Sequence, residues 1–452
     1  MNPSWTPCRC GCRDSAVNTG DRILVVGTTA DYINILRQRQ PDRCLFLTSK
    51  VERKKAFEDQ PSPGEECLFP SYAGVGNIIT ALEDHLIRWR MTPVGIVCYD
   101  CEFMSTTAAI GSHFRLPYPS IETVANCRNK HRCKEIWSDS GIPCPRSMQF
   151  SNPGEATAFF KSMGGPVVIK PLTGSGSEWV FRCDTEKACG DKARLILDMI
   201  GCHGDKRMYG DERMYGDEPD AAAGTRAPVR ATVEEYVSGM EYSCDLLVNW
   251  FDARMIRLAR KIPALDQSFG TTLAYEVQGN LPKDVKLSEL TTILERAARA
   301  IGIKQAICMV DFIISDGLPM LIEMTPRPGG DCLPFLIRQA SGFDIFQASL
   351  DLALGHTVQI PEASQWEHLL GLRLFADRSG IVATMDIRLL EQDPRVREIC
   401  VNRRSGHRVI LPPGDYDSRL IGHVIFAPEH GHDAEVECSE LSKLLQIEWE
   451  TP

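Results

Sequence analysis

Two carboxylates on either side of a short turn form the strongest candidate for metal chemistry in the chain. Asp311 begins one apolar segment and Glu323 ends the next, with an Asp-Gly dipeptide between them. A two-residue turn would place Asp311 opposite Ile322, whereas a loop of three or five residues would place it opposite Glu323. Pro319 cannot donate to a strand ladder, which favours the odd loop. Facing carboxylates repel without a cation, so the pair predicts a Mg²⁺ site, with a purely structural role left open.

A glycine- and serine-rich loop could bind phosphate together with a neighbouring lysine. The segment Gly174-Ser175-Gly176-Ser177 closely follows Lys170, which ends an apolar run. Backbone N–H groups of such a loop can approach phosphate oxygens closely, and Lys170 would direct an ammonium toward the same anion. A plain hairpin turn is the alternative. The loop is not a P-loop, because no Gly-Lys-Ser/Thr follows it.

Three glutamates and one arginine complete the set of residues that could do chemistry. Glu234, Glu235 and Glu241 lie close together in the chain. They could form a solvated strand edge, or accept hydrogen bonds from adenine N6 and ribose hydroxyls. Arg327 lies between two prolines, four residues after Glu323. A stiffened arginine there suits a carboxylate or phosphate, with an ordinary surface loop as the alternative.

The segments around these residues predict an α/β chain of three domains. A Rossmann-like domain is expected over 21–119, because buried strands alternate with helices there. No G-x-G-x-x-G motif follows its first strand, so a dinucleotide site is a weak hypothesis. A second domain is expected over 120–360 and a small, mostly strand-like domain over 366–452. Strands are expected at 23–27, 44–48, 94–99, 166–170, 179–181, 229–236, 242–250, 308–314 and 319–324, and helices at 31–39, 78–89, 129–140, 286–301, 333–341, 345–354 and 434–445.

Two segments are expected to lie outside these domains. Residues 1–20 predict a disordered tail, although their C-x-C-x-C cluster could also bind a soft metal. The stretch 202–228 contains a tandem repeat of Arg-Met-Tyr-Gly-Asp-Glu at 207–218. Its period is too short for a solenoid, so it predicts a loop insertion.

Composition excludes several classes of protein. The 452 residues carry a net charge of −10, which argues against a nucleic-acid binder. No apolar run approaches the roughly 20 residues of a membrane helix. The 18 cysteines are scattered and no secretory signal precedes them, which predicts reduced thiols and a cytoplasmic location.

In their order and spacing, the segments resemble the ATP-grasp superfamily from about Asp21 to Gly355. The matching motifs are Asn129-Lys130 before Gly141-Ile-Pro-Cys-Pro145, Pro-Val-Val-Ile-Lys170-Pro, the Gly-Ser-Gly-Ser loop, Glu-Glu-Tyr-Val-x-Gly-x-Glu241-Tyr-Ser, and Asp311…Glu323-x-x-Pro-Arg327-Pro-Gly-Gly. The segment from Gly330 to Phe346, and more weakly the C-terminal segment, look most like carboxylate–amine ligases of the L-amino-acid ligase type. The resemblance implies a Rossmann-like pre-ATP-grasp domain, an ATP-grasp domain of two α+β subdomains and a small C-terminal α+β domain.

The resemblance also implies an ATP site. Its members would be Lys130, Lys170, Gly174, Ser175, Gly176, Ser177, Glu234, Glu235, Val237 and Glu241. The lysines would contact phosphates and the loop at 174–177 would close over the β- and γ-phosphates. Glu234 would lie at adenine N6 beside backbone groups of Glu235 and Val237, and Glu241 would hold the ribose hydroxyls.

For the metal and the substrates, the resemblance assigns Asp311 and Glu323 to Mg²⁺ or Mn²⁺. Thr325 stands where many relatives have a metal-binding Asn; a hydroxyl is a poorer ligand, which argues against full occupancy of a second ion. Arg327 and Lys170 would be catalytic, with Arg327 stabilising an acyl phosphate and the tetrahedral intermediate. The substrate pocket would include Lys261, Glu276, Arg327 and Gly330.

The implied reaction is ATP- and Mg²⁺-dependent ligation of a carboxylate, in the first instance an amino acid, to an amine. It would proceed through an acyl phosphate and release ADP and phosphate. The expected partners are ATP and small carboxylate and amine substrates, without nucleic acid or a membrane. Another ATP-grasp reaction, such as carboxylation or carbamoyl phosphate formation, is one alternative. A non-catalytic nucleotide-binding protein is the other, on the strength of Thr325. The sequence leaves a homodimer and the identity of the acid and amine open.

Overall fold

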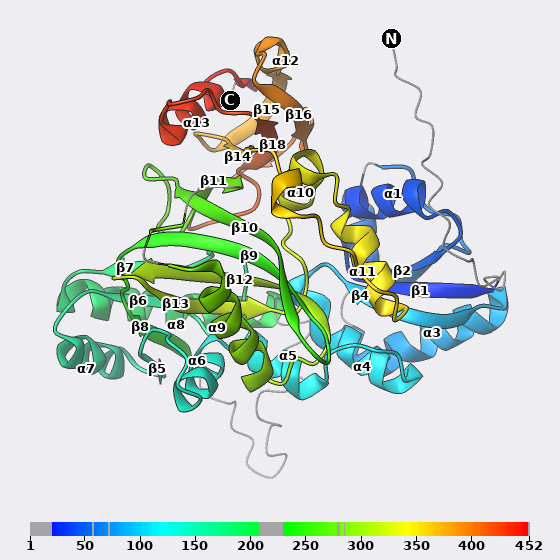
Figure 1. The fold of residues 1–452 in the computed structure, drawn as a ribbon, viewed down its shortest axis with the longest axis horizontal. Coiled ribbons are helices and arrows are strands. Elements are labelled where there is room, and N and C mark those ends of the chain that lie inside the picture. Colours follow the sequence, from blue (N-terminus) through cyan, green and yellow to red (C-terminus); the bar gives the residue numbers. More distant parts are fainter. Residues whose placement is uncertain are drawn as a thin grey trace.

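The computed structural model describes residues 20–56, 58–70, 73–207, 229–277, 281–283 and 285–450. The N-terminal cysteine cluster and nearly all of the tandem repeat lie outside these residues. Figure 1 shows the first sheet at one side of the molecule, a second at the other, and the C-terminal elements above a large central sheet.

The N-terminal part is a parallel sheet in the order β3-β2-β1-β4. Its two middle strands are almost continuously apolar, as strands covered on both faces require; Leu24, Val25 and Val26 are fully buried. The elements of this part are β1 (Asp21–Val26), α1 (Ala30–Arg39), β2 (Cys44–Ser49), α2 (Lys50–Lys55), β3 (Glu66–Phe69), α3 (Val75–Trp89), β4 (Thr92–Cys98), the short turn η1 (Cys101–Phe103) and α4 (Met104–Phe114).

Two helices lead into a second, antiparallel sheet in the order β5-β8-β6-β7. Apolar residues of α7 and α8 pack on this sheet around Val167, Ile169 and Val233. The elements are α5 (Ile121–Arg128), α6 (Lys130–Asp139), β5 (Ser147–Phe150), α7 (Pro153–Met163), β6 (Val167–Pro171), β7 (Phe181–Cys183), α8 (Glu186–Arg207) and β8 (Ala231–Glu235).

The central sheet has eight antiparallel strands in the order β13-β12-β9-β10-β11-β14-β18-β16. It continues past residue 360, because Ala274 of β11 pairs with Leu372 of β14. Its strands and covering helices are β9 (Met240–Val248), β10 (Ala253–Pro263), β11 (Thr272–Val277), α9 (Leu287–Ala300), β12 (Ala306–Ser315), β13 (Leu318–Thr325), α10 (Leu333–Ser341), α11 (Ile345–Ala353), β14 (Leu370–Phe375), β16 (Val396–Val401) and β18 (Leu420–Phe426).

The C-terminal residues add a small sheet in the order β17-β15-β19. Its strands and two helices share an apolar core with β14 and β18, centred on Leu372, Val382 and Ile421. The remaining elements are η3 (Ala363–Gln365), β15 (Gly380–Asp386), α12 (Arg388–Gln392), β17 (Arg408–Val409), α13 (Ala434–Ser442) and β19 (Gln446–Trp449).

The turn between β12 and β13 corrects one sequence expectation. The odd loop is wrong: Ser315 pairs with Leu318, so only Asp316 and Gly317 form the turn. Both have positive φ, +48° and +76°, as a type I′ hairpin turn requires. Asp311 nevertheless faces Glu323, because a bulge shifts the register between residues 311 and 312. Pro319 is tolerated because β13 is the edge strand.

The predicted fold class is otherwise confirmed. A Rossmann-like α/β sheet comes first, two α+β units follow, and a small α+β unit ends the chain. Among the described helices, none is both long and apolar enough to cross a membrane.

Candidate active site

A cavity of about 180 Å³ lies where the second sheet meets the central sheet. Strands from both sheets contribute side chains to it, together with the loop after β6 and the start of α6. All ten residues expected at an ATP site line this cavity, and so do Asp311, Glu323 and Lys261. Its walls also include apolar and aromatic side chains suited to a planar base: Val168, Val180, Tyr236, Phe269, Phe312, Ile313 and Ile322.

The glycine- and serine-rich loop is held over the cavity by contacts from both sides. Lys130 Nζ donates to the carbonyl oxygen of Gly174 at 2.8 Å. Ser177 Oγ donates to the carbonyl oxygen of Gly270, on the far wall, at 2.8 Å. Gly174 and Gly176 have φ of +111° and +68°, a backbone that side chains disfavour. The loop therefore spans the two sheets with its backbone close to the cavity.

A buried network of two lysines and one glutamate lies beneath the loop. Glu234 is 2% exposed, with Lys170 Nζ 2.9 Å from Oε2 and Lys134 Nζ 3.1 Å from Oε1. Burial would raise the pKa of Glu234, but the two lysines lower it. Burial also lowers the pKa of Lys170 to about 8, although Glu234 opposes the shift. The Glu234 carboxylate is thus ion-paired with two lysines, so it is not free to accept a hydrogen bond from adenine N6.

Lys134 was missed by sequence reasoning, although a signal was present. Lys130 begins α6 and Lys134 follows one turn later, so both lie on one face of the helix. The helix is fixed at this end because the Asn129 side chain accepts a hydrogen bond from the Arg132 N–H. Lys134 Nζ also donates to the Ile322 carbonyl at 2.7 Å, which ties α6 to β13.

Asp311 and Glu323 face one another across β12 and β13, with cations on both sides. Lys261 Nζ lies 3.0 Å from Asp311 Oδ2 and 3.4 Å from Glu241 Oε2, and Lys130 Nζ lies 3.6 Å from Glu323 Oε2. Burial would raise the pKa of Glu323, but the surrounding lysines, led by Lys130, hold it at about 2. Burial raises the pKa of Asp311, although Lys261 opposes this.

The carboxylate pair fits a divalent cation. Asp311 Oδ1 is buried and has no hydrogen-bond partner among the described residues, which leaves this oxygen available to a cation. No group of three or more His, Cys, Asp or Glu side chains in the described part could hold a metal alone. A Mg²⁺ would therefore rely on two carboxylates and on substrate oxygens, which is its common mode in phosphate sites. Thr325 does not line the cavity.

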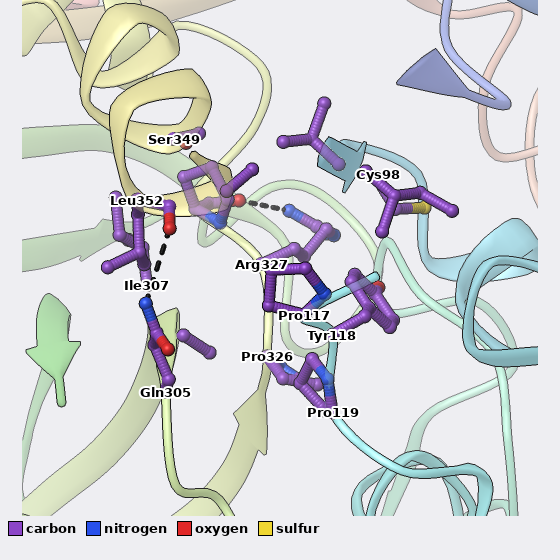
Figure 2. Close-up of a pocket in the computed structure, with 15 residues that line it drawn as sticks. Cys98, Pro117, Tyr118, Pro119, Gln305, Ile307, Pro326, Arg327, Ser349 and Leu352 are labelled. Carbon is purple, nitrogen blue, oxygen red and sulfur yellow. Dashed lines mark hydrogen bonds between the residues drawn. The ribbon is translucent and has the colours of Figure 1, made fainter. Parts of the chain in front are cut away.

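Arg327 turns from the nucleotide cavity toward the N-terminal part. Its Nε donates to Cys101 Sγ at 3.0 Å and its Nη1 to the Pro328 carbonyl at 2.6 Å. Figure 2 shows it beside a second cavity of about 50 Å³ between β4, α11 and the start of β12. Burial would lower the pKa of Arg327, but Cys101 and Asp100 raise it, so the guanidinium stays charged.

A buried ion pair supports the loop that carries Arg327. Arg257 Nε lies 2.6 Å from Asp245 Oδ2, both side chains are fully buried, and Asp245 Oδ1 accepts the Gly329 N–H at 2.7 Å. A Cβ at position 329 would lie 2.6 Å from Leu333 Cδ1, so a larger residue there would require the leucine side chain to move. Nothing in the local sequence links residues 245 and 257 to this loop.

Besides Arg327, two of the expected substrate residues, Glu276 and Gly330, do not line the nucleotide cavity. Glu276 pairs with Arg260 at 2.7 Å and with His368 at 2.9 Å, on the face of β11 opposite Tyr275. It does not line either cavity described above. Gly330 lies beside Arg327, where a Cβ would be 3.6 Å from Arg327 Nη1.

Sequence comparisons find relatives but no matching family model. An uncharacterized protein of Sinorhizobium fredii is 24% identical over 324 residues, 72% of this chain and 61% of its own length. Carnosine synthase 1 of Gallus gallus is 30% identical over 149 residues, 32% of this chain and 16% of its own. A D-alanine–D-alanine ligase of Delftia acidovorans is 22% identical over 224 residues, 47% of this chain and 60% of its own. The chain thus spans less than two thirds of these relatives.

Structural comparison covers nearly the whole chain. The L-amino acid ligase from Bacillus licheniformis superposes with a TM-score of 0.72 and 17% identity, over 96% of this chain and 100% of its own. The chain has the ATP-grasp fold. A biotin carboxylase from Campylobacter jejuni shares it, with a TM-score of 0.64 and 15% identity over 95% of this chain and 92% of its own. The resemblance to ATP-grasp ligases inferred from the motifs is confirmed.

Proposed function

We propose that this ATP-grasp chain is an ATP- and Mg²⁺-dependent ligase that joins a carboxylate, in the first instance an amino acid, to an amine. The observation that carries the proposal is one cavity in which a glycine-rich loop, three lysines and two facing carboxylates meet. The relatives named D-alanine–D-alanine ligase and carnosine synthase 1 support a C–N bond as the product.

The cavity's own residues would bind and orient ATP. Lys130 and Lys170 would neutralise phosphate charge while the loop at 174–177 covers the phosphates. The apolar and aromatic wall would take the adenine, and Glu241 the ribose hydroxyls. Lys134 and Glu234 would position Lys170. Asp311 and Glu323 would hold Mg²⁺, which supplies charge neutralisation and alignment of the phosphates.

The reaction would take two displacements. A carboxylate oxygen attacks the γ-phosphorus, the bond to the bridging oxygen breaks, and ADP leaves with the electron pair. The amine nitrogen then attacks the acyl carbon, the C–O bond to phosphate breaks, phosphate leaves, and the nitrogen loses a proton. Arg327 would stabilise the acyl phosphate and the oxyanion of the second step, because a guanidinium fork fits both.

A carboxylase is the second candidate, because structural neighbours include biotin carboxylase and N5-carboxyaminoimidazole synthase. The two are separated by measuring Mg·ATP-dependent phosphate release with amino acids and small carboxylates, alone and in pairs, and with bicarbonate. Release that needs one carboxylate and one amine supports the ligase. Release that needs bicarbonate supports the carboxylase. ATP binding without release under every condition would contradict both.

A further inference from the structure

The loop that would cover the phosphates is anchored outside the nucleotide cavity. This phosphate loop, residues 172–180, joins β6 to β7. From position 173 to position 180, every residue lines the cavity except Trp179. The Trp179 side chain is 8% exposed and packs instead in the apolar core of the second sheet, with Val167 and Ile169. Trp179 is therefore an anchor of the loop rather than part of the cavity wall.

A tyrosine from the C-terminal part completes this core. Tyr416 lies in the β17–β18 loop, residues 410–419, and belongs with Trp179 to one buried apolar cluster. Among the described residues of that cluster, Tyr416 alone comes from beyond β8. Burial raises the pKa of Tyr416 and a hydrogen bond from the Trp179 backbone lowers it. The tyrosine therefore lies directly against the phosphate loop.

The phosphate loop needs such support because its backbone is strained. It forms bends and turns rather than a strand or helix. Ser177 and Trp179 have φ of +58° and +54°, in the left-handed region that non-glycine residues disfavour. Backbone of this kind persists only where surrounding contacts hold it. The shape of the loop is therefore set by the parts of the chain that touch it.

A second contact reaches the phosphate loop from the β10–β11 loop, residues 264–271. The Ser177 hydroxyl donates to the Gly270 carbonyl at 2.8 Å. A Cβ on Gly270 would lie 3.4 Å from Ser177 Cβ, and Gly270 has a φ of +82° that suits glycine. Both residues line the cavity, so the two loops meet over it.

Arg419, at the end of the β17–β18 loop, fixes the β10–β11 loop. It is 3% exposed and donates to Gln267 Oε1 at 2.5 Å and to Thr271 Oγ1 at 3.0 Å. Its guanidinium carbon lies 5.8 Å from the centre of the Tyr416 ring. One short segment of the C-terminal part thus contacts both loops that meet over the cavity.

We propose that Tyr416 and Arg419 are positioning residues that hold the phosphate loop closed over the β- and γ-phosphates of ATP. Tyr416 acts through Trp179, and Arg419 acts through the β10–β11 loop. This inference rests on the nucleotide site of the proposed function. Among the described residues, none beyond Glu323 lines the cavity. The C-terminal part therefore sets the affinity for the phosphates without touching them.

The first test compares two nucleotides that share adenosine and the α-phosphate. The dissociation constants of Mg·ATP and AMP are measured by calorimetric titration. In Tyr416→Ala, the ratio of Kd for AMP to Kd for ATP should fall about five- to tenfold, because only ATP reaches under the loop. Tyr416→Phe, which keeps the ring, should lose less, and Arg419→Gln should lower the ratio about twofold.

The outcomes separate this inference from the proposed function. An unchanged ratio in Tyr416→Ala, or an equal weakening of both nucleotides, overturns the positioning role alone. A wild-type chain that does not bind Mg·ATP overturns the nucleotide site and the proposed function as well.

A second measurement reads the loop directly and needs no nucleotide affinity. Hydrogen exchange followed by mass spectrometry should show the amides of residues 172–180 exchanging about threefold faster or more in Tyr416→Ala. Val409→Ala is the matched control, because Val409 is buried in the core of the same C-terminal part. It should leave loop exchange and the nucleotide ratio as in the wild type.

The exchange data can also overturn the inference. A loop that stays slow in Tyr416→Ala contradicts it, and so does a loop that becomes equally fast in Val409→Ala. Where Tyr416→Ala does not fold, Gln267→Ala removes one acceptor of Arg419 on the β10–β11 loop. That variant should shift loop exchange in the same direction, and unchanged exchange there overturns the role of Arg419.

Discussion

The nucleotide cavity and the region around Arg327 are built in different ways. The cavity takes most of its polar residues from short contiguous motifs, such as the loop at 174–177 and the segment from Glu234 to Glu241. The Arg327 region draws Cys101 from the N-terminal part, Asp245 from the central sheet and, from the C-terminal segment, Arg373, which pairs with Asp331. The difference teaches that contacts made by short contiguous motifs can be read from the sequence, whereas the contacts of the Arg327 region are assembled from distant parts of the chain.

The largest expected effect comes from the metal site. Glu323→Gln removes one of two facing carboxylates, so kcat for Mg·ATP-dependent turnover should fall about 10²–10³-fold with every donor and acceptor alike. Titrating turnover against Mg²⁺ at saturating ATP checks this. Glu289→Gln, on the exposed side of α9, is the control. A loss confined to some substrates would break the contrast between the nucleotide cavity and the Arg327 region.

The next effect concerns the support of the Arg327 loop. Asp245→Asn leaves the Arg257 guanidinium buried without its carboxylate, which should cost about 3–5 kcal/mol of unfolding free energy. Chemical denaturation of the variant measures it. Asp252→Asn, on the exposed β9–β10 turn, should cost far less. A small change for Asp245→Asn would show that the buried pair does not hold this loop.

ATP affinity should depend on the protonation of Lys170. Burial holds the pKa of its ammonium at about 8, and only the charged form attracts phosphate. Raising the pH through 8 therefore removes a favourable charge, and Kd for ATP should rise by up to about tenfold per pH unit above it. Calorimetric titrations between neutral and alkaline pH measure this. Lys170→Arg stays charged and should flatten the profile, while a flat wild-type profile would contradict the assignment.

The smallest effect tests the contact between Arg327 and the N-terminal part. Cys101→Ala removes the sulfur acceptor of Arg327 Nε, and one weak hydrogen bond should change kcat/KM for the acid about two- to fivefold. ATP affinity, measured in parallel, should stay the same because Cys101 is not part of the nucleotide cavity. Cys101→Ser should recover part of the loss. A parallel loss of ATP affinity would mean that the two regions are not separable.

Sequence reasoning succeeded where function is carried by short motifs. The facing of Asp311 and Glu323 and the closeness of Lys170 to the loop at 174–177 were expected from local patterns, and Lys130 was expected there from the resemblance to the ATP-grasp superfamily. The reason given for the facing was wrong, because a bulge rather than an odd loop sets the register. A β-bulge has no distinct signature in the amino-acid sequence, so counting the residues between the two carboxylates could not reveal it.

The contacts of the Arg327 region could not be predicted in this way. In the sequence, nothing distinguishes Arg257 and Asp245 from other polar residues of their strands. Only the sheet register pairs them and brings Asp245 to the Gly329 N–H. Arg373 lies 42 residues beyond Asp331, and no spacing rule joins them. Glu234 and Lys134 show the same limit beside the cavity, since their pairing depends on how α6 packs against two sheets. Tertiary packing, rather than local propensity, decides these partners.

One measurement tests the central claim most directly. The chain is supplied with Mg·ATP, a donor acid labelled with ¹⁸O in its carboxyl group, and an amine, and the released phosphate is analysed by mass spectrometry. Activation through an acyl phosphate predicts that one ¹⁸O atom passes from the acid to the phosphate for each C–N bond formed. Phosphate without label, in the presence of product, would contradict carboxylate activation and with it the roles given to Arg327, Asp311 and Glu323.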